Sequence, residues 1–161
     1  MKALIVYDSM YGNTEQVAQA VCETLAEGGE AAAVRVGELL PAQWEGVDLL
    51  VVGSPTQKFN PTAAISNLLK GFPGDGLKGK AVAAFDTRMT EQEINQTKVL
   101  AFFVGIFGYA AKPMAQRMMQ KGGRLVVPAE GFLVQGMEGP LVEGELERAR
   151  AWGTKILAEM G

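Results

Sequence analysis

The chain has 161 residues, 48% hydrophobic and 20% charged, which fits one folded domain with a buried core rather than a disordered chain. Its formal net charge of -3 argues against nucleic acid as a partner, because binding a phosphate backbone needs clustered Lys and Arg. There is no histidine, and Cys22 is the single cysteine, which excludes Ser-His-Asp and Cys-His catalytic sites and an internal disulfide. We therefore expect one domain over residues 1–161, with no catalytic side chain and no metal.

Apolar runs bounded by turn residues alternate along the chain with stretches of helical periodicity. The runs that predict buried strands are residues 3–7, 31–36, 47–52 and 81–85. Helical spacing marks residues 14–27, which end at a pair of glycines, and residues 62–70, which follow Pro61.

The second half of the chain is less regular. After a polar connection a helical region extends to about residue 121, and Pro113 marks a kink or a fresh start within it. Residues 124–127 and 131–134 predict two pieces of a fifth strand, interrupted by Pro128. A last helix starts at about residue 143.

This order of elements predicts an α/β domain, with a parallel sheet and helices on both faces joined by right-handed crossovers. Ligands of such sheets bind at the carboxyl ends of the strands, beside the point where the strand order reverses. The loops after the first, third and fourth strands are therefore where we expect the chemistry.

Residues 99–111 are apolar throughout, as the residues of a membrane-spanning segment are. These 13 residues are too few to span a bilayer, so we expect no transmembrane segment. A buried helix, or one covered in a homodimer, is favoured over an interfacial membrane anchor. Lys2 leads into a strand-like run rather than a signal peptide, so a cytoplasmic protein is the simplest expectation.

The loop after the first strand, Asp8-Ser-Met-Tyr-Gly-Asn-Thr14, has the composition of an anion site. Short polar side chains surround Gly12, which permits a turn that other residues resist. The first N–H groups of the following helix have no internal partners and attract an anion, so a phosphate monoester fits this loop without Lys or Arg. The alternative is that Asn13 or Thr14 merely caps the helix. Neither a Gly-x-x-x-x-Gly-Lys loop nor a Gly-x-Gly-x-x-Gly fingerprint is present.

Residues 9–14 resemble the phosphate loop of flavodoxins, Ser/Thr-x-Thr-Gly-x-Thr after the first strand, with Tyr11 where the family usually has Thr. Residues 53–56, Gly-Ser-Pro-Thr, resemble the second flavin loop, and residues 84–88 stand in place of the third. The tail over residues 130–148 is similar to a bacterial and archaeal branch of short flavodoxin-like proteins. The resemblance implies a single-domain flavodoxin-like three-layer sandwich, with a five-stranded parallel sheet of order 2-1-3-4-5.

The resemblance also implies that the chain binds flavin mononucleotide (FMN) through these three loops. The residues it assigns to the phosphate are Ser9, Met10, Tyr11, Gly12, Asn13 and Thr14. Those it assigns to the two sides of the isoalloxazine ring are Ser54, Pro55, Thr56, Gln57, Lys58 and Phe59, with Asp86, Thr87 and Arg88 opposite. Phe59 is the candidate to stack on the ring, with ordinary core packing as its alternative.

Several ring-loop residues depart from the family pattern. Gln57 and Arg88 stand where flavodoxins often have Trp and Tyr. Lys58 and Arg88 would place positive charge beside the ring and raise its reduction potential, unless they are solvated loop charges. Residues 57–60 contain no Gly, although Asn60 tolerates left-handed geometry. Tyr109 is a candidate lid, with packing against the sheet or a partner subunit as its alternative.

The leading functional hypothesis is an FMN-binding carrier that shuttles electrons between redox partner proteins. The alternative is an FMN-dependent NAD(P)H:quinone or flavin oxidoreductase, with residues 89–111 building a substrate pocket or dimer interface. A phosphoacceptor signalling domain needs clustered aspartates, and only Asp8 is suitably placed. A structural role without flavin is the remaining hypothesis.

Overall fold

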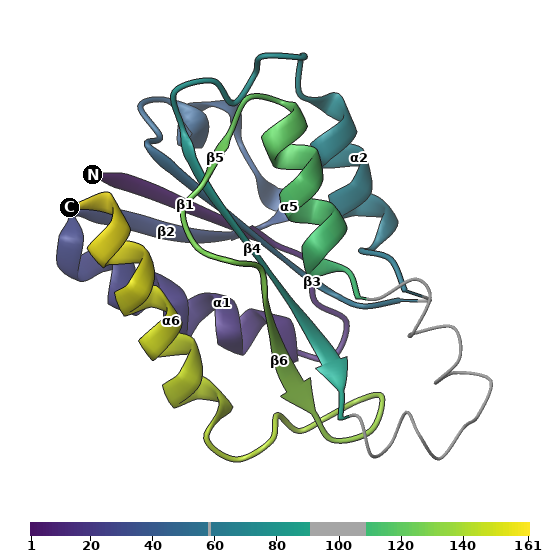
Figure 1. Cartoon of the computed structure of the whole chain (residues 1–161). Coiled ribbons are helices and arrows are strands. Elements are labelled where there is room, and N and C mark those ends of the chain that lie inside the picture. The colour runs from purple at the N-terminus through teal and green to yellow at the C-terminus, as the bar shows by residue number, and fades with distance from the viewer. Residues whose placement is uncertain (58, 91–108) are drawn as a thin grey trace.

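The protein is built on one parallel β-sheet, seen in a computed structural model that describes residues 1–57, 59–90 and 109–161. The described strands are β1 (Lys2–Tyr7), β2 (Glu30–Arg35), β3 (Leu49–Pro55), β4 (Ala81–Met89), β5 (Arg124–Leu125) and β6 (Glu130–Val134). They lie in the order β2-β1-β3-β4-β5, and β6 also pairs with β4 (Figure 1). The strand order implied by the resemblance is confirmed.

Strands β5 and β6 share one side of β4. Ala81 and Val82 of β4 pair with β5, whereas Phe85 to Met89 pair with β6. Pro128 lies between the two pieces, where its missing N–H removes a donor from the ladder. The prediction of a fifth strand in two pieces is therefore confirmed.

Helices cover both faces of the sheet and complete the three layers (Figure 1). Helices α1 (Asn13–Leu25) and α6 (Glu145–Met160) pack on one face. The other face carries α2 (Ala63–Gly71) and α5 (Ala111–Gln120). The 3₁₀ turns are Ala26–Gly28, Val36–Glu38 and Pro41–Trp44. Pro113 lies in the first turn of α5, so it marks a fresh start rather than a kink.

The face covered by α1 and α6 has an aromatic cluster at its centre. The ring of Phe85 meets those of Phe132 and Trp152 edge-on, with each pair of centroids 5.9 Å apart. A Cβ on Gly53 would lie only 2.1 Å from the Phe85 ring. Gly53 is thus needed in β3 because a fully buried ring occupies the space where a side chain would stand.

Two strands run further than the sequence predicts. β3 continues to Pro55 and β4 to Met89, so Asp86, Thr87 and Arg88 belong to a strand and not to a loop. The polar residues remain extended because β3 pairs along one side of them and β6 along the other. Among the described residues, no helix is both long enough and apolar enough to cross a membrane.

Candidate functional site

A cavity of about 890 Å³ opens at the carboxyl ends of the central strands. This volume lies within the range of sites that hold drug-sized ligands and cofactors. The residues that line it come from four segments: Ser9, Met10, Tyr11, Asn13 and Thr14; Pro55, Thr56, Gln57, Phe59, Asn60 and Pro61; Thr87, Arg88, Met89 and Tyr109; and Val134, Gly136 and Met137. The three segments predicted from the sequence therefore meet at one cavity.

The first of these segments has the geometry of an anion-binding loop. Gly12 precedes α1 with a φ of 90°, and no atom lies within 4 Å of the position its Cβ would take. The Ser9 hydroxyl oxygen accepts hydrogen bonds from the Gly12 N–H (3.1 Å) and the Glu15 N–H (3.3 Å), which leaves its own O–H to donate. Within the described part of the chain, the N–H groups of Met10, Tyr11, Asn13 and Thr14 have no acceptor.

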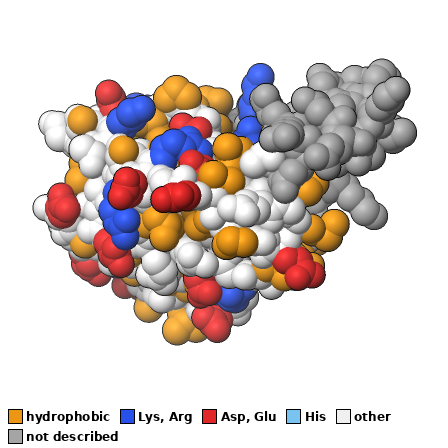
Figure 2. All heavy atoms as spheres, turned by 90° about the horizontal axis from the view of Figure 1, so that it is seen from below, with side chains coloured by type: hydrophobic (Ala, Val, Ile, Leu, Met, Phe, Trp, Pro, Cys, Tyr) orange, Lys and Arg blue, Asp and Glu red, His pale blue; other side chains and the backbone are white. Residues whose placement is uncertain are grey.

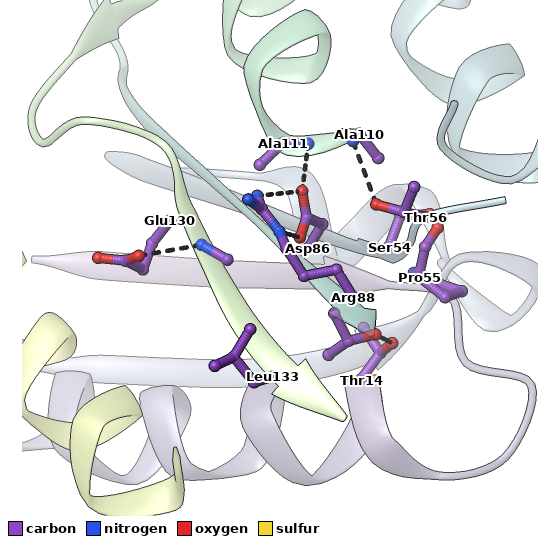
Figure 3. Close-up of polar contacts among 12 residues, drawn as sticks. Thr14, Ser54, Pro55, Thr56, Asp86, Arg88, Ala110, Ala111, Glu130 and Leu133 are labelled. Atoms are coloured by element: carbon purple, nitrogen blue, oxygen red, sulfur yellow. Dashed lines mark hydrogen bonds and ion pairs between the residues drawn. The ribbon is translucent and has the colours of Figure 1, made fainter. Parts of the chain in front are cut away.

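The side chains of Asn13 and Thr14 connect this loop to other segments. Both residues are already inside α1, so the hypothesis that either merely caps the helix is wrong. The Asn13 amide nitrogen donates to the Glu138 carbonyl oxygen at 3.0 Å. The hydroxyl oxygens of Thr14 and Thr87 are 2.8 Å apart, and both residues are buried (Thr14 is labelled in Figure 3). These contacts fix the end of β4 and the segment after β6 against the anion-binding loop.

The second segment is shaped by hydroxyl groups. Ser54 is fully buried, and its hydroxyl accepts from the Thr62 N–H (3.0 Å) and donates to the Pro55 carbonyl (2.9 Å). Ser54 therefore stabilises this loop through hydrogen bonds and does not itself line the cavity. The Thr56 hydroxyl accepts a hydrogen bond of 3.2 Å from the Ala110 N–H, which brings the start of α5 to this wall (Figure 3).

A tight turn follows Thr56. The backbones of Gln57 and Asn60 exchange hydrogen bonds of 2.8 and 2.9 Å. Among the described residues of this turn, Phe59 is left-handed, with a φ of 73°, whereas Asn60, which tolerates that geometry, is not. Phe59 lines the cavity and is not a member of either core cluster of the described residues. Strained backbone of this kind gathers at functional sites. Lys58 lies outside the described residues.

The third segment carries a buried ion pair. The Arg88 guanidinium donates to both carboxylate oxygens of Asp86, at 2.6 and 2.7 Å. The Ala111 N–H adds a third hydrogen bond to this carboxylate at 2.9 Å (Figure 3). Burial raises the pKa of the fully buried Asp86 carboxyl, and the Arg88 hydrogen bonds and charge oppose that rise.

This pairing changes the interpretation of Arg88. The sequence suggested a cation beside the ring or a solvated loop charge, but the guanidinium is only 23% exposed and its charge is paired with Asp86. The guanidinium also lies 3.7 Å from the centre of the Tyr109 ring, which places Tyr109 over Arg88 at the cavity wall. Tyr109 to Ala111 are the described part of the apolar segment; the rest of it lies outside the described residues.

Sequence reasoning missed the segment after β6. Val134, Gly136 and Met137 line the cavity, and Met137 is 75% exposed at its rim. A signal was present in the closely spaced Gly136 and Gly139, which have φ values of 64° and 103°. The resemblance had included this tail only as a mark of one branch of the family. Of the residues assigned to FMN, Gly12, Ser54 and Asp86 support the cavity from outside its lining.

Charge is mixed on the face of the molecule drawn in Figure 2. Lys and Arg side chains alternate there with Asp and Glu, and hydrophobic side chains lie between them. The described residues on this face thus form no basic patch of the kind that nucleic-acid binding needs.

The family model described as flavodoxin matches residues 5–152. The chain belongs to the flavodoxin family. It is similar in structure to a flavodoxin from the domain Archaea, with a TM-score of 0.77, 19% identity and coverage of 99% of this chain and 98% of that one. Flavodoxin 1 from Bacillus cereus gives a TM-score of 0.75 at 15% identity, with 98% of both chains covered.

The same fold occurs within a larger enzyme. The rubredoxin oxygen:oxidoreductase from Desulfovibrio gigas matches 99% of this chain, with a TM-score of 0.72 and 19% identity, but only 37% of its own chain is covered. At these identities the likeness concerns the fold, whereas the family model supports a flavin cofactor. The residues present fit FMN, because unbonded N–H groups suited to a phosphate stand at one end of a cavity whose other walls are largely apolar.

Proposed function

We propose that this flavodoxin-family chain binds FMN in the cavity and carries electrons between redox partner proteins. The observation that carries the proposal is a group of N–H donors at Met10, Tyr11, Asn13 and Thr14, beside the Ser9 hydroxyl, that have no acceptor among the described residues. These donors surround a turn that leaves room for an anion, and the positive end of α1 lies behind them. Bound FMN supplies the redox chemistry, because its ring accepts and returns electrons.

The other walls suit a flat aromatic ring. We assign Phe59 to one side, because it is an aromatic residue in the cavity lining. Pro55, Thr56 and Gln57 also line the cavity, and Thr87 with Arg88 lines the adjoining wall from the neighbouring strand β4. Since Asp86 already balances the charge of Arg88, we expect this wall to place little net positive charge beside the ring.

The apolar rim supports a role in which electrons leave through protein contact. Met10 is 58% exposed, Tyr11 50% and Met137 75%, and all three border the cavity. Exposed apolar residues gathered around one opening are typical of an interaction site. We expect redox proteins to approach this rim, and we expect the protein to act in the cytoplasm. A homodimer through residues 99–111 stays a prediction.

A steady-state assay separates the carrier from the reductase alternative. The FMN-loaded chain is mixed with NADH or NADPH and a quinone, and in parallel it is reduced by a flavodoxin reductase and offered a protein acceptor. The carrier proposal expects fast transfer to the protein and negligible turnover with nicotinamide and quinone alone. Rapid turnover without a protein partner would identify an oxidoreductase and overturn the carrier role.

A further inference from the structure

Arg35, at the carboxyl end of β2, does not line the cavity but contacts the loop at residues 9–14 from the β2 side. One of its guanidinium nitrogens donates to the Ser9 carbonyl oxygen at 2.7 Å and lies 3.8 Å from a carboxylate oxygen of Asp8. The other terminal nitrogen lies 3.8 Å from a carboxylate oxygen of Glu15. The guanidinium also stands 5.5 Å from the centre of the Tyr7 ring. Within the described part of the chain, its polar partners therefore belong to the loop after β1 and to the start of α1.

The first consequence concerns charge. Residues 9–14 contain no Lys or Arg, and the loop is flanked by the carboxylates of Asp8 and Glu15. A phosphomonoester dianion placed there is repelled by both carboxylates. Glu15 is held in place because the Tyr7 hydroxyl donates to it at 2.8 Å. Burial and this hydrogen bond raise the pKa of Tyr7 to about 12, so the phenol stays neutral. Arg35 is the cation that contacts both carboxylates.

The second consequence concerns the direction of a peptide group. The Ser9 carbonyl and the Met10 N–H belong to one planar trans peptide, so they point in opposite directions. Arg35 holds the Ser9 oxygen on the β2 side of the loop. The Met10 N–H, which has no acceptor within the described residues, consequently points away from β2. A carbonyl oxygen turned toward the anion would repel it, whereas this N–H attracts it.

We infer that Arg35 is a positioning residue for the phosphate of the bound ligand. It offsets the charges of Asp8 and Glu15 and orients the Ser9–Met10 peptide with its donor toward the anion. The inference rests on the proposed binding of FMN, and it concerns only the phosphate end of that ligand.

The test compares FMN with riboflavin, which has the same ring and ribityl chain but no phosphate. Dissociation constants are measured by flavin fluorescence for the wild-type chain, R35Q and R35K. We expect R35Q to weaken FMN binding about tenfold or more, the effect of losing a charge-assisted hydrogen bond, and to leave riboflavin binding nearly unchanged. R35K keeps the positive charge but not the planar guanidinium, so we expect its FMN affinity to lie between those of the wild type and R35Q. The matched control is R150Q, whose arginine pairs with Glu23 at 3.7 Å and does not line the cavity.

A second pair of substitutions tests the charge argument without removing Arg35. In D8N/E15Q both side chains keep an oxygen for the Ser9 N–H and the Tyr7 hydroxyl, but the two charges are gone. We expect D8N/E15Q to bind FMN more tightly than the wild type without a matching gain for riboflavin. In this background the loss caused by R35Q shrinks.

Two outcomes overturn the role of Arg35 alone. Either R35Q weakens FMN and riboflavin equally, which indicates a general structural role, or it weakens neither. If R35Q does not fold, the D8N/E15Q result decides, and equal changes for the two ligands contradict the inference. Failure of the wild-type chain to bind FMN is a different result, because it removes the proposed function itself.

Discussion

The buried pair of Asp86 and Arg88 gives the most quantitative prediction. In D86N the carboxylate that accepts two hydrogen bonds from Arg88 and one from the Ala111 N–H becomes a neutral amide. The amide oxygen can still accept from the Ala111 N–H and from one Arg88 terminal nitrogen, but the amide NH₂ group then faces the Arg88 Nε–H. The substitution therefore leaves a cation that is only 23% exposed without its counter-charge.

Removing one partner of a buried ion pair costs about 3–5 kcal/mol. Because water reaches part of Arg88 and none of Asp86, we expect D86N to fall near the lower end, at about 3 kcal/mol. R88Q strands the fully buried carboxylate instead, and burial then favours its protonated form. The Asp86 pKa is already raised in the folded wild type, and without Arg88 it lies higher still. R88Q therefore becomes less stable relative to the wild type as pH rises above the wild-type Asp86 pKa.

Urea unfolding followed by circular dichroism measures these effects for the wild type, D86N, R88Q and the double variant. The double variant is expected to lose less than the sum of the two single losses, since neither partner is left alone. The matched control is D75N, an exposed aspartate on a turn, with an expected change below about 0.5 kcal/mol. A D86N chain as stable as D75N, or strictly additive losses, would refute the reasoning.

Three other changes test separate parts of the structure. G53A should lower the free energy of unfolding by about 1–3 kcal/mol because its Cβ meets the buried Phe85 ring, whereas G37A, with no atom within 4 Å, should not show this loss. Burial opposes ionisation of Glu145, but hydrogen bonds from Arg148 and the Leu133 N–H hold its pKa below 4.5. The stability advantage of the wild type over E145Q should therefore shrink as pH falls below 4.5. A stability difference that stays constant with pH in urea unfolding would contradict this. G12A should weaken FMN binding in fluorescence titrations, because an L residue resists a φ of 90°, and unchanged affinity would count against the loop geometry.

Local patterns were sufficient for the central strands and for the turn at Gly12 before α1. Continuous apolar runs identify strands that are covered on both faces, and the residues around Gly12 carry their own turn chemistry. The second half of β4 was not predictable, because Asp86, Thr87 and Arg88 are polar and stay extended only through pairing with β3 and β6. Once the strand continues, Asp86 and Arg88 share a face at spacing two, which explains their pairing.

The cavity walls after β3 and β6 depended still more on tertiary contacts. Nothing in the order Gln57-Lys-Phe-Asn60 distinguishes Phe59 as the left-handed residue, because that depends on which backbone groups pair across the turn. The segment after β6 reaches the cavity because the Asn13 side chain holds the Glu138 carbonyl, a contact between residues 125 positions apart. Arg35 carried no sequence signal, since its role follows from the adjacency of β2 and the first loop.

The central claim is that the loop at residues 9–14 binds the phosphate of FMN. Its most direct test is a parallel titration of the flavin-free wild-type chain with FMN and with riboflavin, followed by flavin fluorescence. The account predicts that one equivalent of FMN binds with quenching of its fluorescence. It also predicts that riboflavin binds at least about 100-fold more weakly, because it has no phosphate to accept hydrogen bonds from the N–H donors of the loop. No binding of FMN, or equal affinity for the two flavins, would contradict it.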